Sequence, residues 1–226
     1  MFAPDFNAPK FTVVDLGTKK AGALDVFRKH GKMYFGLDAE CRPDVCLGVD
    51  LADKYKDDVK KRGYRFRSAD VLSEDFDWPS ADFYLAFDFL EHLPSKEMSA
   101  AVLRTMLERA RRGVWLRMPS FEQDGTGEKP LRDLGMRFAW TNWHGHPSHY
   151  LVSEAKSVIE LVKPDAKVKH KHNKLIHNTH NQDVVPMDAP LDTRKYEPME
   201  HGPKPWHKLD PPLIGQHEII VQFDGS

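Results

Sequence analysis

Residues 82–94, DFYLAFDFLEHLP, decide how this sequence folds. The run over residues 83–87 is apolar without interruption, which is typical of a strand that is buried on both faces. The chain turns polar at Asp88, and a helix is predicted over residues 95–110, where Ser95 can cap the N-terminus. A buried strand, a short turn and a long helix are the parts of a βαβ unit, so this stretch predicts a parallel sheet.

The same alternation of apolar strands and helices extends on both sides of this stretch. Strands are expected over residues 11–16, 45–49, 64–67 and 113–118, and helices over residues 21–30 and 54–62. The buried face of the helix over residues 95–110 is expected to carry residues that recur every fourth position, namely Met98, Val102, Met106 and Ala110. Right-handed crossovers place the C-terminal ends of parallel strands at one edge of the sheet, where ligands bind.

The pattern changes after Pro119. Residues 120–150 are expected to be rich in loops, and a helix over residues 153–162 and a strand over residues 167–176 follow. Residues 181–216 contain seven prolines and little periodicity, which indicates a long extended connection. The last strand is expected over residues 217–223.

Composition narrows the functional class. The formal net charge of −1 and the sequence pI of about 6.9 give no overall basic excess of the kind that nucleic-acid binding usually requires. The sequence has no run of about 18 apolar residues and no signal-peptide pattern, so we expect a cytoplasmic protein without a membrane span. Cys41 and Cys46 are expected to be reduced structural thiols.

These residues resemble the class I S-adenosylmethionine-dependent methyltransferase family over roughly residues 10–120. The string LEHLP at residues 90–94, after a buried strand and before a long helix, is the most specific part of the resemblance. The family's glycine-rich first motif corresponds to residues 14–22, VDLGTKKAG. Gly17 falls where the family expects a glycine, whereas Lys19 and Ala21 occupy the next two glycine positions.

The resemblance implies S-adenosylmethionine as the cofactor. It further implies a set of cofactor-binding residues at the ends of the strands, namely Asp15, Gly17, Asp50, Asp70, Asp88 and Phe89. The residue resembling Asp50 accepts the ribose hydroxyls in the family, and the residue resembling Asp70 contacts the adenine amino group. Asp38 is the alternative to Asp50, and choosing Asp50 implies an insertion around residues 31–44.

The implied fold is α/β: a Rossmann-like, doubly wound, mostly parallel seven-stranded sheet with an antiparallel last strand and helices on both faces. We expect one domain over residues 1–226, with a cofactor-binding half at 10–120, an acceptor-side half at 120–180, a proline-rich excursion at 181–216 and the last strand at 217–226. The excursion is expected to cover the acceptor site or a partner, so that its deletion would impair turnover or assembly but spare cofactor affinity.

Seven of the twelve histidines fall between residues 144 and 180. The candidates for a catalytic base are His144, His146 and His149, which follow the fifth strand, where acceptor-binding elements commonly lie in this fold. The same three imidazoles could instead bind zinc or be ordinary loop histidines. His92 is a further candidate base, and a solvated strand edge explains His170 and His172.

The predicted function is methyl transfer from S-adenosylmethionine to an unidentified acceptor. One alternative is a non-catalytic relative that keeps the fold as a cofactor-binding or structural module. Another is a histidine-based metallohydrolase, which would bind metal and have no affinity for the cofactor. The absence of GxGxxG argues against a nicotinamide cofactor. Asp88 does not begin the [DNS]PP[YF] motif of methyltransferases that act on amino groups of nucleic acids or glutamine.

Overall fold

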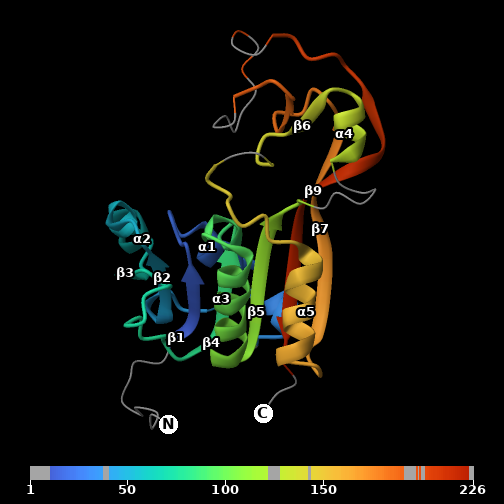
Figure 1. Cartoon of the computed structure of the whole chain (residues 1–226). Coiled ribbons are helices and arrows are strands. Elements are labelled where there is room, and N and C mark those ends of the chain that lie inside the picture. Colours follow the sequence, from blue (N-terminus) through green and yellow to red (C-terminus); the bar gives the residue numbers. More distant parts are fainter. Residues whose placement is uncertain are drawn as a thin grey trace.

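A seven-stranded sheet forms the centre of the molecule, with strand order β3-β2-β1-β4-β5-β9-β7 (Figure 1). The computed structural model describes residues 11–37, 41–121, 128–141, 144–190, 197, 199 and 202–223. The strands of this sheet are β1 (Phe11–Leu16), β2 (Cys46–Asp50), β3 (Arg65–Ser68), β4 (Ala81–Phe87), β5 (Ala110–Pro119), β7 (Lys167–Asn178) and β9 (Lys208–Gln222). β1 to β5 run parallel, and β9 is antiparallel to both of its neighbours. The predicted fold is therefore confirmed.

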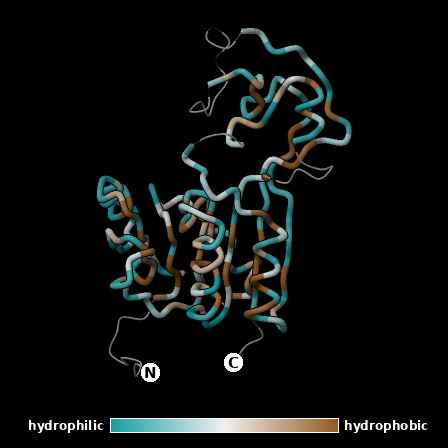
Figure 2. The backbone as a smooth tube through the Cα atoms, in the orientation of Figure 1, coloured by the Kyte–Doolittle hydropathy of each residue, from teal (hydrophilic) through white to brown (hydrophobic). Residues whose placement is uncertain are grey.

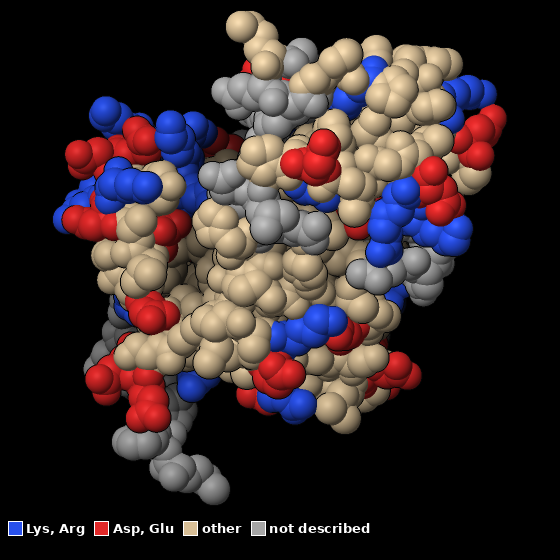
Figure 3. Space-filling view, turned by 45° about the horizontal axis from the view of Figure 1, so that its top comes forward, with Lys and Arg blue, Asp and Glu red and all other residues tan. Residues whose placement is uncertain are grey.

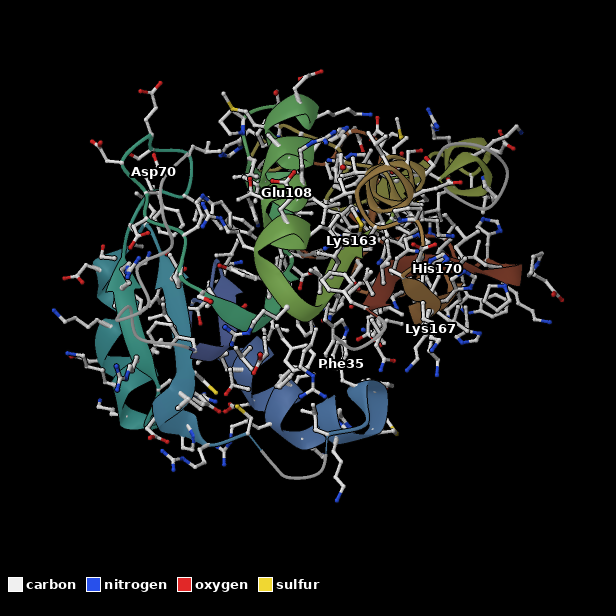
Figure 4. All side chains as sticks on the ribbon, turned by 90° about the horizontal axis from the view of Figure 1, so that it is seen from below. Phe35, Asp70, Glu108, Lys163, Lys167 and His170 are labelled. Atoms are coloured by element: carbon white, nitrogen blue, oxygen red, sulfur yellow. The ribbon has the colours of Figure 1, made fainter. Side chains whose placement is uncertain are left out.

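Helices cover both faces of the sheet, as the view from below shows (Figure 4). They are α1 (Gly22–Phe35), α2 (Lys56–Lys61), α3 (Lys96–Arg109), α4 (Lys129–Asp133) and α5 (Val152–Val162). α1 and α2 bury one apolar cluster around Phe27 and Trp115, and α3 and α5 bury a second cluster around Leu103 and Val114 on the other face. Each sheet face thus has its own core, which is why the central strands read as uninterrupted apolar runs.

Ser95 caps α3 as predicted, because its Oγ accepts a hydrogen bond of 3.3 Å from the backbone N–H of Met98. The predicted buried face was wrong at Met98, whose residue is 42% exposed. Positions four residues apart in an α-helix drift by about 40° at each step, so four of them do not share one face. Val102, Met106 and Ala110 are buried as predicted, and the helix also buries Ser99, Leu103 and Leu107.

The connection between β1 and β2 is a longer helix than expected. α1 continues to Phe35, five residues beyond the expected end at residue 30, and Gly36 ends it with a φ of 62°. The thiols of Cys41 and Cys46 follow and are free and buried, with their Sγ atoms 3.0 Å apart. The lengthened helix accounts for part of the insertion expected around residues 31–44.

A second, smaller lobe stands on the end of the sheet (Figure 1). Its two-stranded sheet pairs β6 (Met136–Phe138) with β8 (Val184–Pro186), and α4 packs beside it. The apolar residues that fill its core come from this sheet, from α4 and from the projecting ends of β7 and β9, and they are Leu131, Met136, Phe138, Ile176, Val184, Leu209 and Leu213. Figure 2 shows these hydrophobic segments gathered inside the lobe.

Two expectations for the C-terminal half were therefore wrong. Residues 181–216 are not simply an extended connection, because they contain β8, and residues 208–216 belong to β9. β9 begins nine residues before the expected start at 217. Its added residues pair with the C-terminal end of β7, as in the pair Ile176↔Leu213. The Lys204 ammonium, which is buried, donates to the backbone carbonyls of Asn181 and Val184 and ties the returning chain to β8.

Among the residues that the structure describes, no helix combines the length and the apolar character needed to span a membrane.

Candidate functional site

A pocket of about 450 Å³ opens at the C-terminal ends of β1 to β4. Its volume lies within the range of small-molecule and cofactor sites. Four of the predicted strand-end residues and the predicted aromatic residue beside them meet in its wall, namely Gly17, Asp50, Asp70, Asp88 and Phe89. Figure 3 looks toward this end of the sheet, where a mostly uncharged surface separates the charged side chains at the upper left from the lobe.

The turn after β1 has positive φ at Gly17, Lys19 and Ala21, and only the first of these is a glycine. Gly17 has a φ of +69°, and a Cβ atom there would lie 2.4 Å from the Phe89 ring. Lys19 and Ala21 have φ values of 44° and 61°, a conformation that costs a residue with a Cβ atom about 1–2 kcal/mol. The loop is therefore held in a strained conformation that glycine would adopt without cost.

Asp50 fixes this turn against β2. Its carboxylate accepts hydrogen bonds of 2.9 Å from the backbone N–H groups of Lys19 and Ala52, one on each oxygen. The backbone N–H groups of Gly17 and Thr18 both donate to the carbonyl of Val49 on the same strand. Two donors orient the carboxylate toward the pocket, and each oxygen retains acceptor capacity for a ligand hydroxyl. Asp38, the alternative, lies outside the described residues.

Asp70 lies at the other side of the pocket, after β3. Its Oδ1 accepts from the backbone N–H of Leu72 at 2.9 Å, which holds the chain in a tight turn. That turn presents Val71 and Leu72 to the pocket, next to Ala69. The result is an apolar slot with a carboxylate at its edge, which suits a flat heterocycle that carries an amino group.

Asp88 is already engaged by protein groups. Its Oδ2 accepts from the guanidinium of Arg117 at 2.7 Å, and its Oδ1 accepts from the Gln216 amide at 2.8 Å. Its backbone has a φ of 50°, and its N–H donates to the Arg117 carbonyl. Asp88 therefore ties the end of β4 to β5 and β9, and any contact with a ligand uses its remaining lone pairs.

Asp15 lies beneath the glycine turn, 1% exposed. Burial raises its pKa to about 7, the Thr18 side chain lowers it, and the nearby Asp50 charge raises it further. It lines a second hollow of about 360 Å³ together with Gly17, Lys19 and Asp88. The structure therefore places Asp15 behind the turn, next to the pocket that holds the other five predicted residues.

The loop after β5 returns to the LEHLP turn, which forms a 3₁₀ helix, η3 (Leu90–His92). The His92 Nδ1 lies 2.5 Å from the Gly145 carbonyl, and the Ser148 N–H donates to the Glu91 carbonyl at 3.3 Å. Below them the Ser99 hydroxyl, on α3, lies 2.9 Å from that of Ser148. These contacts place the predicted acceptor loop beside His92, a residue of the pocket wall.

The three predicted histidines of this loop have different surroundings. His146 is buried, and its ring lies 4.7 Å from that of His92. His149 stacks on Phe121 at 4.7 Å, and burial lowers its pKa. His144 is exposed. The structure therefore does not gather the three into one group.

Sequence reasoning missed Glu91, which lies next to His92 and His146. Its carboxylate is fully buried, and burial raises its pKa to about 8, with the Asp88 charge as a smaller cause. One donor atom from each of these three residues lies within 4.8 Å of the others. The sequence shows Glu91 and His92 side by side before a helix, but His146 follows His92 by 54 residues, and nothing local links them.

A second group of imidazoles lies on β7 and β9 and does not line the pocket. His170 and His172 share one face of β7, as predicted, and His217 of β9 lies opposite His172. Burial lowers the pKa of His170 to about 4, and the neighbouring Lys156 ammonium lowers it further. That ammonium lies 3.1 Å from the ring and repels any cation there. Figure 4 shows Asp70 and His170 at opposite ends of the sheet.

Comparison with solved structures identifies the architecture. The chain aligns with a SAM-dependent methyltransferase from Archaeoglobus fulgidus over 96% of its own length and 86% of that protein, with 14% identity and a TM-score of 0.55. A putative methyltransferase from Bacillus halodurans aligns over 96% and 94%, with 10% identity and a TM-score of 0.55. An O-methyltransferase family protein from Burkholderia thailandensis aligns over 96% and 52%, with 13% identity and a TM-score of 0.54, so the chain spans about half of that protein.

The fold is that of the class I methyltransferases. No protein-family model matches the sequence, and no curated protein matches it. In this methyltransferase fold the pocket lies where the β1, β2, β3 and β4 strand ends meet, and His92 of η3 with Leu93 and Pro94 forms its far wall.

Proposed function

We propose that this chain binds S-adenosylmethionine in the pocket at the ends of β1 to β4 and transfers its methyl group to an acceptor. The observation that carries the proposal is the convergence of Gly17, Asp50 and Asp70 on one pocket in a methyltransferase fold. The glycine turn lets the backbone approach the methionine portion, the oriented Asp50 carboxylate accepts the ribose hydroxyls, and the slot beside Asp70 takes the adenine.

We assign the acceptor side to His92 in the pocket wall and to the neighbouring loop that carries His146 and His149, which contacts η3. Holding the sulfonium methyl group and the acceptor nucleophile in line at reacting distance supplies much of the acceleration in such a displacement. In the transfer the nucleophile forms a bond to the methyl carbon while the sulfur–carbon bond breaks. The electron pair of the broken bond stays on sulfur. Phe121, which is buried, stacks on His149 and supports this loop.

Calorimetry with S-adenosylmethionine and S-adenosylhomocysteine tests the cofactor site. We expect Asp50→Ala to weaken binding by about 100-fold, because two charge-assisted hydrogen bonds of roughly 1.5 kcal/mol each are lost. Asp53→Ala is the matched control, since Asp53 is an exposed aspartate three residues later. Failure of the wild-type chain to bind either compound would remove the proposed function.

One observation favours a second candidate, a non-catalytic cofactor-binding module. Lys19 and Ala21 occupy glycine positions, and the Asp88 carboxylate is held by Arg117 and Gln216. Incubation with S-adenosylmethionine labelled in the methyl group and a metabolite extract distinguishes the two candidates. Label in a product supports the enzyme, and cofactor binding without any labelled product supports the module.

A further inference from the structure

The Glu91 carboxylate is buried, and no other described residue donates a hydrogen bond to it. Its residue is 0% exposed, and neither carboxylate oxygen has a hydrogen-bond partner among the residues that the structure describes. An uncompensated buried carboxylate is costly, and buried charges in proteins are normally paired or coordinate metals. The Ser148 N–H donates to the Glu91 backbone carbonyl, so the loop after β5 packs on the segment that carries this side chain.

The backbone contacts of the two neighbouring imidazoles indicate which ring nitrogen carries the hydrogen. The His92 Nδ1 lies 2.5 Å from the Gly145 carbonyl, and the His146 Nδ1 lies 3.3 Å from the Trp140 carbonyl. A carbonyl oxygen only accepts, so each Nδ1 carries the hydrogen and Nε2 carries the lone pair in the neutral ring. Donation of the second ring N–H to a carbonyl is the usual arrangement of a metal-ligating histidine.

The three donor groups converge although they come from two separate segments. Their ligand atoms lie within 4.8 Å of one another, and the rings of His92 and His146 are 4.7 Å apart. Ligands of one ion at about 2.1 Å are at most roughly 4.2 Å apart, so small side-chain rotations complete a site. Two imidazoles and one carboxylate with open positions form a ligand set that binds divalent first-row metals.

We propose that Glu91, His92 and His146 bind a divalent first-row metal ion at the acceptor end of the pocket. His92 belongs both to this ligand set and to the wall of the pocket, so the ion lies beside the place where the acceptor enters. Three protein ligands leave coordination positions for water or for an acceptor atom. The positive ion also compensates the buried Glu91 carboxylate.

The ion indicates the class of acceptor, and this step rests on the proposed function. A metal ion lowers the pKa of a bound hydroxyl and turns it into a nucleophile near neutral pH. The acceptor hydroxyl releases its proton to solvent water, its oxygen forms the bond to the methyl carbon, and the sulfonium leaves as the neutral thioether. An acceptor with a hydroxyl group gains most from such an ion, so we infer O-methylation.

Metal binding is measured on the full chain without cofactor. After treatment with EDTA, Mn²⁺ and Zn²⁺ are each titrated alone by calorimetry, and we expect one ion per chain for at least one of them. Glu91→Gln and His146→Gln should weaken that binding at least about 100-fold. The matched controls Glu97→Gln and His177→Gln replace exposed residues outside the cluster and should bind as the wild type does.

Circular dichroism and urea unfolding show whether each variant has folded, and affinity for S-adenosylmethionine without metal is measured separately on the wild type. A wild-type chain that binds neither ion stoichiometrically, or folded Glu91 and His146 variants that bind like the wild type, would overturn the site. Loss of metal binding in the control variants as well would also overturn it. If the wild type binds metal but not the cofactor, the metal site stands and the proposed function is refuted. If it binds the cofactor but not metal, only the metal site is refuted.

Discussion

The buried carboxyl group of Asp15 should make the stability of the protein depend on pH. Burial raises its pKa from an ordinary value of 3.8 to about 7, and the groups that face it are Thr18, Asp50 and Arg117. Asp15→Asn keeps the shape of the side chain and removes the titration. The quantity to compare is how the free energy of unfolding of each protein changes with pH. Any effect of the substitution that is the same at every pH does not alter this change.

The sign follows from where the proton is held. Below about pH 4 the group is protonated in both the folded and the unfolded chain, and it costs nothing. Between about pH 4 and pH 7 the folded chain keeps the proton and the unfolded chain releases it, so stability falls as the pH rises. Above about pH 7 both forms are ionised, and the full cost of about 4 kcal/mol remains, since 1.36 kcal/mol corresponds to each pKa unit.

Urea unfolding followed by tryptophan fluorescence measures the effect. Between about pH 5 and about pH 7.5 the wild type should lose about 2.5 kcal/mol more stability than Asp15→Asn. Glu91 also titrates in this range, but it is present in both proteins and its effect cancels. Parallel stability profiles for the two proteins would show that Asp15 is ionised in the folded chain at acidic pH, and would refute the reasoning.

Three further substitutions test the turn and the helix cap by urea unfolding. Gly17→Ala should destabilise the protein by about 1–3 kcal/mol more than Gly36→Ala. Both glycines have positive φ, but only at Gly17 would a Cβ atom clash with the Phe89 ring. Equal losses of stability in the two variants would show that this clash does not cause the destabilisation. Lys19→Gly should stabilise by up to about 1 kcal/mol, because glycine adopts the positive φ without strain; a clear loss of stability would contradict the strain. Ser95→Ala should cost about 1 kcal/mol, and no loss would mean that the hydroxyl does not stabilise the start of α3.

Local patterns were enough to predict the sheet and the residues at its edge. Apolar runs that end at Asp50 and Asp88 identify buried parallel strands, and the topology rules then bring their ends together without any knowledge of contacts. The prediction failed where one residue depends on another that lies far along the chain. Nothing local shows that Gln216 reaches Asp88, or that His146 lies beside Glu91.

The lobe was missed for a related reason. Three-residue strands such as β6 and β8 carry too few positions to show a period, and each is stable only because it pairs with the other. Prolines at 211 and 212 argued against a strand, yet residues on either side of them pair with β7 across register irregularities. Tertiary packing on Leu209 and Leu213 therefore overrides the local signal.

The position of β9 has a consequence for how the chain folds during synthesis. β9 lies between β5 and β7, although it follows both in the sequence, and Gly113 pairs with Gln222. Until residues up to 222 have left the ribosome, β5 and β7 each have an edge without its final neighbour, and such edges promote association between chains. The strand ends that line the pocket belong to β1 to β4, so the nascent chain can form most of the pocket wall before β9 arrives, and the contact of Gln216 with Asp88 completes it only when the sheet closes.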